Sequence, residues 1–309
     1  MRTVLAPDPV DWVGQFEGKL IAPWALPRRG PGRFLGRRYL PGASGWPGWT
    51  LLEGLARLWA GSDTARGYRA RFALRRLVAN LVRPSVGGEL LAPSLGALEP
   101  FARHEGKKVL LLDLPLLGQL NRDLDRALTS HPRSSFLRRF RASRSDVVRQ
   151  EQEFVLADEI LVSHPYVLEL LKGRGLPCRL WERALPRVKR ACPGRDILLA
   201  GLPTGRNGIY EMLEVLSRHP EWRLRVRLGE GLEPTGLLDH PQVRAARDFE
   251  EVAVVVAPSW VESSAVEVGQ AELLGLPVIA TDRAAGFAGC RRVRVGDAEA
   301  LEKALEQIL

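Results

Sequence analysis

The chain has few of the residues and segments that mark several common protein classes. It holds only three cysteines in 309 residues, Cys178, Cys192 and Cys290, and their spacing fits no metal-binding pattern. We therefore expect reduced thiols rather than a disulfide framework. No apolar run is long enough to span a bilayer, because the run Val109–Leu120 is interrupted by Asp113. The first residues lack the apolar core of a signal peptide, which predicts a cytoplasmic protein.

Several sequence motifs are also missing. The chain has no P-loop, no solenoid-type repeat and no recognisable order of Ser, His and Asp or of Cys and His for nucleophilic catalysis. Its net charge of +9 would suit a nucleic-acid partner, but no nucleic-acid-binding module is recognisable. We therefore expect no nucleic-acid partner.

Positive charge is concentrated in the first part of the chain. Residues 1–190 hold 32 Lys and Arg against 18 Asp and Glu, whereas residues 191–309 hold 13 against 18. A basic first domain favours an anionic partner, such as an anionic membrane surface contacted peripherally through residues 1–188. The alternative is that arginine simply replaces lysine on solvated faces, since lysine is scarce before residue 180.

Apolar runs alternate with helical patterns, and this order predicts an α/β fold. The stretch Arg183–Arg195 has the proline, glycine and charge of an interdomain linker. We therefore expect two Rossmann-like domains facing a cleft, over residues 1–188 and 189–309. The expected strands include Thr3–Ala6, Lys108–Asp113, Glu159–Ser163, Cys178–Trp181, Asp196–Ala200, Leu224–Leu228, Val252–Ala257 and Pro277–Ala280.

Two stretches before residue 90 allow two interpretations each. Pro27–Trp49 is rich in Gly, Pro, Arg and aromatics, and is either an acceptor-binding lid or a decorated surface loop. Ala65–Val82 is a helical pattern with five arginines. It either packs its apolar stripe on a sheet or lies on an anionic membrane.

The segment Pro258–Thr281 is the most informative part of the sequence. An apolar strand is followed by a Ser-rich turn, a helical pattern, Gly275 and a second apolar strand. Such a turn presents backbone N–H groups at a helix N-terminus, where an anion is favoured. Glu262 stands in that turn, and Gln270 lies about two helical turns further on. The segment thus combines an anion cradle with side chains that bind hydroxyl groups.

This segment resembles the donor-binding signature of the retaining GT-B glycosyltransferases of family four, also called glycosyl transferases group 1. Pro258, Ser259, Glu262, Gly275 and the strand 277–281 match the signature, and Gln270 replaces its second glutamate. The stretch of residues 157–177, ADEILVSHPYVLELLKGRGLP, resembles the last βα unit of the first domain in the same family.

The resemblance implies a sugar transfer with retention of configuration. The donor would be a UDP- or GDP-linked sugar acting as co-substrate, without a metal or another cofactor. The acceptor would be a glycan, a lipid or a small molecule. A leaving diphosphate would be stabilised electrostatically by helix N-termini and Arg206.

The candidate site residues follow from the resemblance and from two turns that precede helices. Glu262 is the candidate catalytic residue near the donor sugar; the alternative is an exposed acidic residue that only favours the helix N-terminus. The candidate donor-binding residues are Gly201, Arg206, Asn207, Gly208, Ser263, Ser264, Ala265 and Gln270.

Departures from the family pattern support a rival interpretation. The family has an arginine and a lysine where this chain has Leu202 and Asn207, and Arg206 is the candidate substitute. The neutral amide of Gln270 accepts from ribose hydroxyls more weakly than a carboxylate does. The rival is a degenerate GT-B protein that binds a nucleotide sugar, or a protein partner, without transfer.

The acceptor side is less well marked. His164 and Gln119 each follow an expected strand of the first domain and are candidates for that side, although His164 also suits a capping or packing role. Asp123 and Asp125 have metal-ligand-like spacing, but they lie in a helical pattern with Arg122 and Arg126. We expect a solvated face there and no metal.

Overall fold

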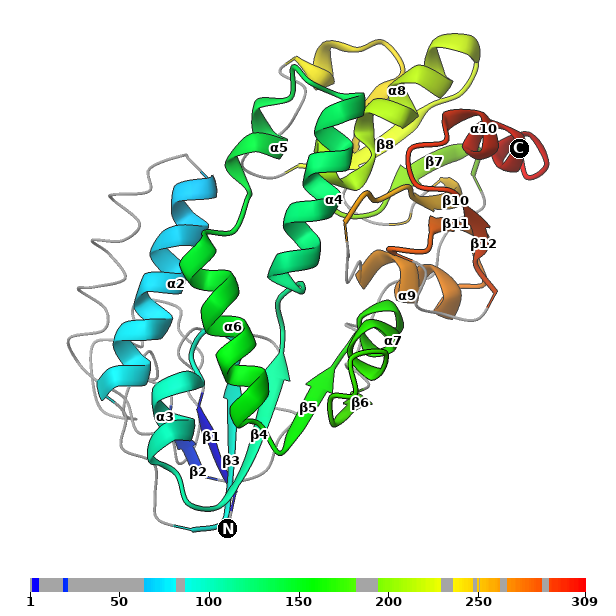
Figure 1. Ribbon diagram of the computed structural model, residues 1–309. Helices are drawn as coiled ribbons and strands as arrows, with labels where there is room; N and C mark the ends of the chain where they lie inside the picture. Colours follow the sequence, from blue (N-terminus) through cyan, green and yellow to red (C-terminus); the bar gives the residue numbers. More distant parts are fainter. Residues whose placement is uncertain are drawn as a thin grey trace, which may run out of the picture. The chain divides into compact units, whose positions relative to one another are not determined.

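The computed structural model of the chain shows two α/β units (Figure 1). It describes residues 2–5, 19–21, 64–81, 87–181, 194–228, 236–246, 249, 251–261, 266–284 and 289–309. The expected loop Pro27–Trp49 and most of the linker Arg183–Arg195 lie outside the described residues. Within the described ranges, no helix is both long and apolar enough to cross a membrane.

The first unit is built on a six-stranded sheet in which every neighbouring pair is parallel. The strand order is β2-β1-β3-β4-β5-β6. β2 therefore lies on one side of β1, and β3 to β6 lie on the other side. The strands are β1 (Arg2–Leu5), β2 (Lys19–Ile21), β3 (Glu89–Pro93), β4 (Lys107–Leu112), β5 (Glu159–Val162) and β6 (Cys178–Leu180).

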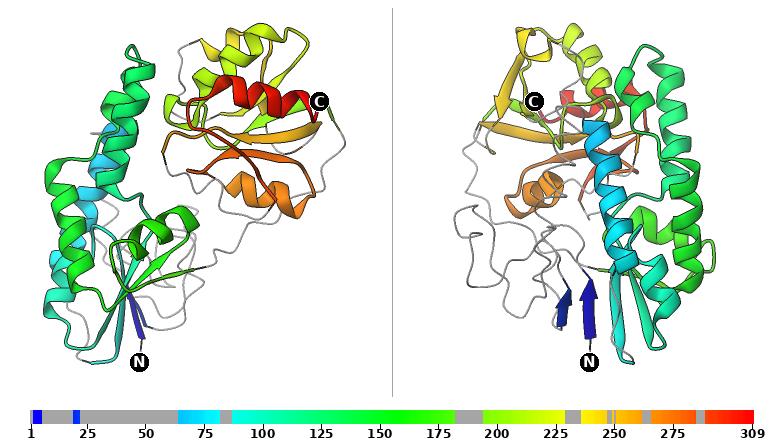
Figure 2. Two further views of the ribbon diagram at one scale, coloured as in Figure 1. Left: turned by 45° about the vertical axis from the view of Figure 1, so that its right-hand side comes forward. Right: turned by 90° about the vertical axis from the view of Figure 1, so that its left-hand side faces the viewer.

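Three helices of this unit pack together. They are α2 (Thr64–Leu81), α3 (Leu98–Arg103) and α6 (Arg144–Leu156). α3 contacts both α2 and α6, and Figures 1 and 2 show α2 and α6 side by side. An ion pair between Arg76 and Asp146 joins α2 to α6. The expected helix Ala65–Val82 is therefore confirmed as α2, and it takes part in packing.

Glu153 of α6 holds the turn between β3 and α3. Its fully buried carboxylate accepts hydrogen bonds from the backbone N–H groups of Leu95 at 2.7 Å, Ala97 at 3.0 Å and Leu98 at 3.1 Å. Leu95 has a φ of 65°, a conformation that costs energy for a residue with a Cβ. The carboxylate therefore fixes a turn that would otherwise relax.

The second unit is built on another parallel six-stranded sheet, with the order β12-β11-β10-β7-β8-β9. Residues 118–142, which include α5 (Ser135–Arg139) and all but the first residue of α4 (Leu117–Ser130), group with this unit, as do residues 164–167. The strands are β7 (Asp196–Leu199), β8 (Leu224–Arg227), β9 (Val243–Ala246), β10 (Val252–Ala257), β11 (Val278–Thr281) and β12 (Arg291–Val293).

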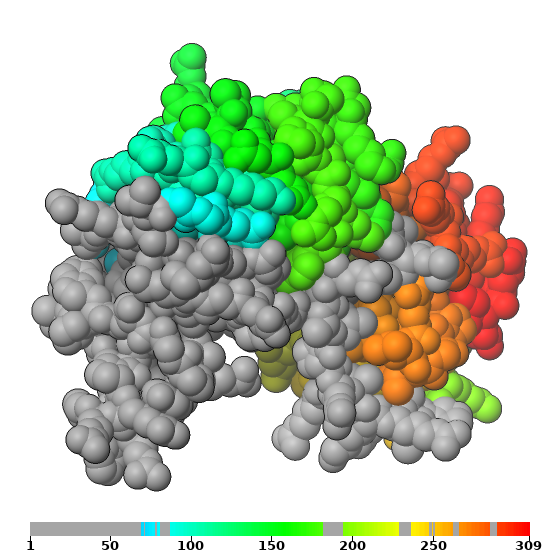
Figure 3. All heavy atoms as spheres, turned by 90° about the horizontal axis from the view of Figure 1, so that it is seen from below, coloured from blue at the N-terminus to red at the C-terminus, as the bar shows by residue number. Residues whose placement is uncertain are grey.

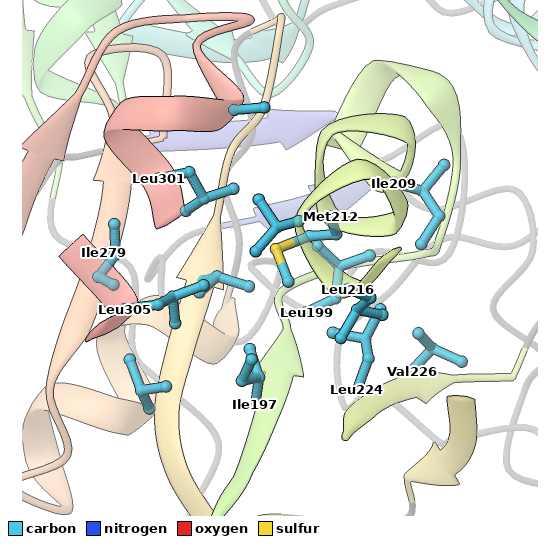
Figure 4. Packing of buried hydrophobic residues seen from close by; sticks show 14 of the residues in the cluster. Ile197, Leu199, Ile209, Met212, Leu216, Leu224, Val226, Ile279, Leu301 and Leu305 are labelled. Carbon is cyan, nitrogen blue, oxygen red and sulfur yellow. The ribbon is translucent and has the colours of Figure 1, made fainter. Parts of the chain in front are cut away.

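Alternate residues of the central strands enter two cores. Ile197 and Leu199 of β7 face a cluster with α8 (Ile209–Arg218) and α10 (Ala298–Glu306), as Figure 4 shows. Leu198 faces a second cluster with α9 (Val266–Leu273). Period-two alternation puts successive side chains on opposite faces of a strand, so helices cover both faces of this sheet.

The α/β class with two parallel sheets is confirmed, and most expected elements appear within two residues of their predicted bounds. α7 (Pro165–Lys172) is one of them. Sequence analysis missed β2, β9 and β12, which have three or four residues each, and β3, which has five residues of which four are buried. The predicted boundary between residues 188 and 189 falls outside the described residues and stays a prediction.

The turn held by Glu153 predicts an unusual pH dependence of stability. Burial raises the pKa of Glu153 to about 7, while the N–H donors and the charge of Arg149 lower it. Because the folded pKa lies above the unfolded value of 4.5, the folded state holds the extra proton between these two pH values. Relative to Glu153→Gln, the wild-type free energy of unfolding should fall by up to about 3 kcal/mol between pH 4.5 and pH 8. Urea unfolding across this range measures the difference, and parallel pH curves for the two proteins would contradict it.

Candidate donor-binding site

The topology of the second sheet selects one place for a ligand. β7 comes first in the sequence among the strands of this sheet. β8 and β9 lie on one side of it, and β10 to β12 lie on the other. The order therefore reverses between β7 and β10. In open α/β sheets, ligands bind beyond the carboxyl ends of the strands at such a switch point. The two turns that follow β7 and β10 are those singled out in the sequence.

The turn after β7 is closed by the side chain of Asn207, which belongs to the turn itself. Gly201 has a φ of 76°, and Nδ2 of Asn207 donates a hydrogen bond of 2.7 Å to the carbonyl of Leu202. A short 3-10 helix, η3 (Gly205–Asn207), leads into α8. Asn207 therefore shapes the turn where the family pattern has a lysine.

Gly208 brings the two turns into contact. It has a φ of 81° and is the N-cap of α8, so that helix begins without a side-chain cap. A Cβ on Gly208 would lie 2.3 Å from the carbonyl oxygen of Pro258. Beside this contact, the N–H of Trp260 donates a 2.9 Å hydrogen bond to the carbonyl of Arg206. The turns after β7 and β10 are thus one assembly.

The turn after β10 is also tied to the next strand. Oγ1 of Thr281, the last residue of β11, donates a 2.8 Å hydrogen bond to the carbonyl of Ser259. Ser259 and Val261 are buried. Glu262, Ser263, Ser264 and Ala265 lie outside the described residues, and their roles stay predictions.

Several polar atoms of this assembly lack a hydrogen-bond partner among the described residues. They are Oγ1 of Thr204, Nε of Arg206, Oδ1 of Asn207 and Oγ of Ser259, and all four are buried. Buried polar groups in proteins are nearly always hydrogen-bonded. Both donors and acceptors occur among these atoms, which suits a ligand carrying phosphate oxygens and hydroxyl groups.

α9 adds a charged pair that sequence analysis missed. Gln270 is buried on this helix, and so is Glu267, three positions earlier and therefore on the same face. Glu267 forms an ion pair of 3.2 Å with Arg227 at the end of β8. An acidic residue midway between Glu262 and Gln270 was visible in the sequence, but its basic partner comes from a strand about 40 residues earlier.

A buried hydrogen-bonded group lies next to the two turns. Nε1 of Trp260 donates to Oε1 of Glu211 at 2.7 Å, and Nε2 of His131 lies 2.7 Å from the same oxygen. Glu211 is 3% exposed and Trp260 is 7% exposed. Neither residue drew attention in the sequence, because their chain positions are 49 residues apart.

The two acceptor-side candidates lie in a polar cluster of the second unit. Nδ1 of buried His164 accepts from the N–H of Tyr166 at 3.2 Å, which is a capping contact. Nε2 of Gln119 donates to Oδ1 of Asp123 at 2.8 Å. Nη2 of Arg283 lies 3.4 Å from the same oxygen, and its guanidinium stacks 4.2 Å from the Tyr166 ring centre.

Asp123 corrects one expectation. We expected a solvated face at Asp123 and Asp125, and Asp125 is largely exposed, but Asp123 is only 2% exposed. Burial raises the pKa of the Asp123 carboxyl, and the charge of Arg283 partly offsets this effect. The expectation failed because the covering residue, Arg283, is 160 positions away in sequence.

One group among the described residues has the composition of a metal site. The ligand atoms of His219, Glu302 and Glu306 lie within 4.8 Å of one another at the far end of α8. Glu302 is already paired with Arg218 at 2.6 Å. The Arg218 guanidinium already balances the negative charge of the Glu302 carboxylate. We therefore assign no metal to this group.

Two Rossmann-like units with helix-flanked parallel sheets define the GT-B fold, the architecture of a large class of glycosyltransferases. Solved structures agree with this assignment. The chain is similar to sucrose-phosphate synthase from Thermosynechococcus elongatus, with a TM-score of 0.60 and 14% identity over 99% of this chain and 89% of that chain. It is also similar to the lipopolysaccharide outer core galactosyltransferase WaaB, with a TM-score of 0.53 and 11% identity over 100% and 90% of the two chains.

A third similar structure is that of Anabaena HepE in complex with UDP. Its TM-score is 0.51 and its identity 11%, over 99% of this chain and 89% of that chain. No protein-family model matches the sequence, and no curated protein matches it either. At these identities the likeness establishes the fold alone.

The contact between the two turns predicts a position-specific cost. Gly208→Ala should lower the free energy of unfolding by about 2–4 kcal/mol, since it adds a steric clash with Pro258 to the cost of a positive φ. Gly275→Ala is the matched control, because Gly275 has a φ of 71° but no atom within 4 Å of its Cβ position. That control should cost only about 1 kcal/mol. Equal losses in urea unfolding would show that the turns do not meet.

Proposed function

We propose that the protein transfers a sugar from a nucleotide sugar to an acceptor. The observation that carries this proposal is the assembly of two touching turns at the switch point, whose buried polar atoms lack partners among the described residues. A nucleotide diphosphate supplies the missing acceptors and donors. UDP is the favoured nucleotide, since a protein of the same fold has been solved with UDP. GDP is the alternative.

The proposed chemistry is electrostatic. The N-termini of α8 and α9 follow the two turns, and their helix dipoles favour the negative charge of a leaving diphosphate. Arg206 adds a guanidinium, whose Nε has no partner among the described residues. Charge that develops on the leaving group is thereby met without a metal or another cofactor.

Glu262 is proposed to contact the donor sugar, with retention of configuration as in the family-four enzymes that the sequence resembles. Val261, the residue before it, is buried and fixed beside the Trp260 anchor. The two residues before Glu262 are therefore both buried. The acceptor is proposed to be a glycan, a lipid or a small molecule, in the cytoplasm or at its membrane face.

Binding without transfer is the second candidate function. It is favoured by Asn207, whose side chain closes the turn instead of offering a charge, and by the neutral Gln270. The carboxylate of Glu267 on the same face of α9 supports donor binding in place of a charge at position 270. Turnover, rather than affinity, separates the two functions.

We further propose peripheral binding to anionic membranes through the first unit. The exposed face of α6 carries Arg144, Val148 and Val155, and Val155 is 83% exposed. Neighbouring α2 exposes Arg69 and Leu77 and contains no acidic residue. The carboxylate of Glu151 on α6 is 45% exposed, and Arg174 pairs with it. Apolar side chains with arginines and one paired acid suit an anionic bilayer surface.

Nucleotide binding tests the main proposal. UDP or a UDP-sugar at a concentration of 100 Kd should add about 2.7 kcal/mol to stability and raise the melting temperature. Arg206→Ala should weaken the affinity about tenfold, because a charge-assisted hydrogen bond is lost. A thermal-shift titration measures both effects. The absence of a shift with UDP, GDP and their sugars would contradict the proposal.

Turnover decides between the two candidate functions. Transfer or hydrolysis of a nucleotide sugar should fall at least about hundredfold in Glu262→Ala, if this carboxylate acts at the donor sugar. Release of the nucleotide from the sugar is the measurement. Nucleotide binding by the wild type with no turnover across a broad acceptor panel would support binding without transfer.

Membrane contact has its own test. Val155→Glu and Arg144→Ala should each reduce co-sedimentation with phosphatidylglycerol vesicles, by about fivefold for the arginine. High salt should have the same effect. Leu273→Glu is the matched control, because Leu273 is 71% exposed on α9, which Figure 3 shows at the surface in orange. Equal losses in Val155→Glu and Leu273→Glu would reject the α2–α6 face.

A further inference from the structure

The turn that precedes Glu262 is anchored by one aromatic side chain. The Trp260 ring lies so close to Gly296, before α10, that a Cβ there would come within 2.5 Å of two ring carbons. Its backbone N–H donates to the carbonyl of Arg206, and its indole N–H donates to Glu211. Trp260 is thus held at three points, and two of them belong to the segment between β7 and α8 or to α8 itself.

Glu211 is well placed to fix this anchor. It stands in the first turn of α8, three residues after Gly208. Its oxygen Oε1 accepts the indole N–H of Trp260 at 2.7 Å, inside the protein, where a hydrogen bond to a carboxylate is strong. A carboxylate in this position ties the turn after β10 to the helix that follows β7.

His131 supplies a second donor to the same oxygen. Its Nε2 lies 2.7 Å from Oε1 of Glu211, and because a carboxylate can only accept, this nitrogen carries the hydrogen. The His131 ring packs on Tyr210 with 4.6 Å between ring centres and meets Trp260 edge-on at 6.0 Å. His131 follows α4, so it reaches Glu211 from a part of the chain between β4 and β5.

We propose that Glu211 is the positioning residue of the donor turn, and that His131 is its partner. By holding the indole of Trp260, Glu211 fixes the turn after β10 just before Glu262, and His131 links the segment of residues 118–142 to the same carboxylate. This role rests on the proposed function. The candidate ligand contacts are made by the two turns. Glu211, Trp260 and His131 therefore affect nucleotide affinity indirectly, by positioning these turns.

The indole N–H of Trp260 gives a direct readout. In the full chain labelled with ¹⁵N-tryptophan, Trp260→Phe identifies the Trp260 indole signal by its loss. Glu211→Leu removes both acceptor oxygens, whereas Glu211→Gln keeps one. His131→Phe keeps the ring that packs on Tyr210 and removes the N–H. The matched controls are Glu214→Gln and Trp222→Phe, since Glu214 is exposed on α8 and Trp222 lies beyond the end of that helix.

The expected results form a graded series. In Glu211→Leu the indole signal should move upfield and its hydrogen exchange should accelerate at least about tenfold, with a rise of about tenfold in the Kd for UDP. Trp260→Phe should raise the Kd similarly. His131→Phe should give a smaller change of the same sign, and Glu211→Gln should largely restore the wild-type values. Glu214→Gln should leave both readouts unchanged, and Trp222→Phe should leave the Trp260 signal and the Kd unchanged.

Two kinds of failure are distinguishable. If the wild type binds UDP and Glu211→Leu, Trp260→Phe and His131→Phe bind it equally well, the positioning role is wrong while the proposed function stands. An unchanged Trp260 signal in Glu211→Leu likewise overturns the role. If the wild type binds no nucleotide, the proposed function fails and the role fails with it. Circular-dichroism melting of each variant separates these outcomes from unfolding, and Trp260→Phe and His131→Phe keep the test valid if Glu211→Leu does not fold.

Discussion

The close approach of Gly208 to Pro258 is the constraint on which the second unit depends. A side chain at position 208 would overlap the carbonyl of Pro258, so only glycine lets the turns after β7 and β10 meet. Their meeting places two helix N-termini at the switch point of one parallel sheet. The cores on both faces of the sheet hold the strands in register, and the turns inherit their positions from that register.

In the same assembly, the backbone groups are hydrogen-bonded whereas several side-chain polar atoms are not. Nδ2 of Asn207 donates to the carbonyl of Leu202, and the carbonyl of Ser259 accepts from Oγ1 of Thr281. Both backbone carbonyls therefore have hydrogen-bond partners. Oγ1 of Thr204, Nε of Arg206 and Oγ of Ser259 are buried without hydrogen-bond partners among the described residues. Because buried polar atoms are nearly always hydrogen-bonded, these three atoms support the donor site that we propose.

The chain departs from the family pattern at particular positions, and the structure gives several of these departures a physical context. Asn207 has a structural role in the turn. Glu267, paired with Arg227, places a charge beside the neutral Gln270. Glu211 and Trp260 join the two turns through a buried hydrogen bond that no local pattern indicates. The first unit uses the same device, since Glu153 holds the turn after β3 with a buried carboxylate.

The sequence by itself determined the class of fold, eight of the twelve described strands, and the two glycine- or serine-containing turns that precede helices. These features are local, because periodicity and turn chemistry act within about ten residues. Only the tertiary structure decided that Asp123 is covered by Arg283, that Glu267 meets Arg227 and that Glu211 receives both Trp260 and His131. Each of these pairs joins residues 40 to 160 positions apart, and such contacts follow from strand order and helix packing, which no short stretch of sequence encodes.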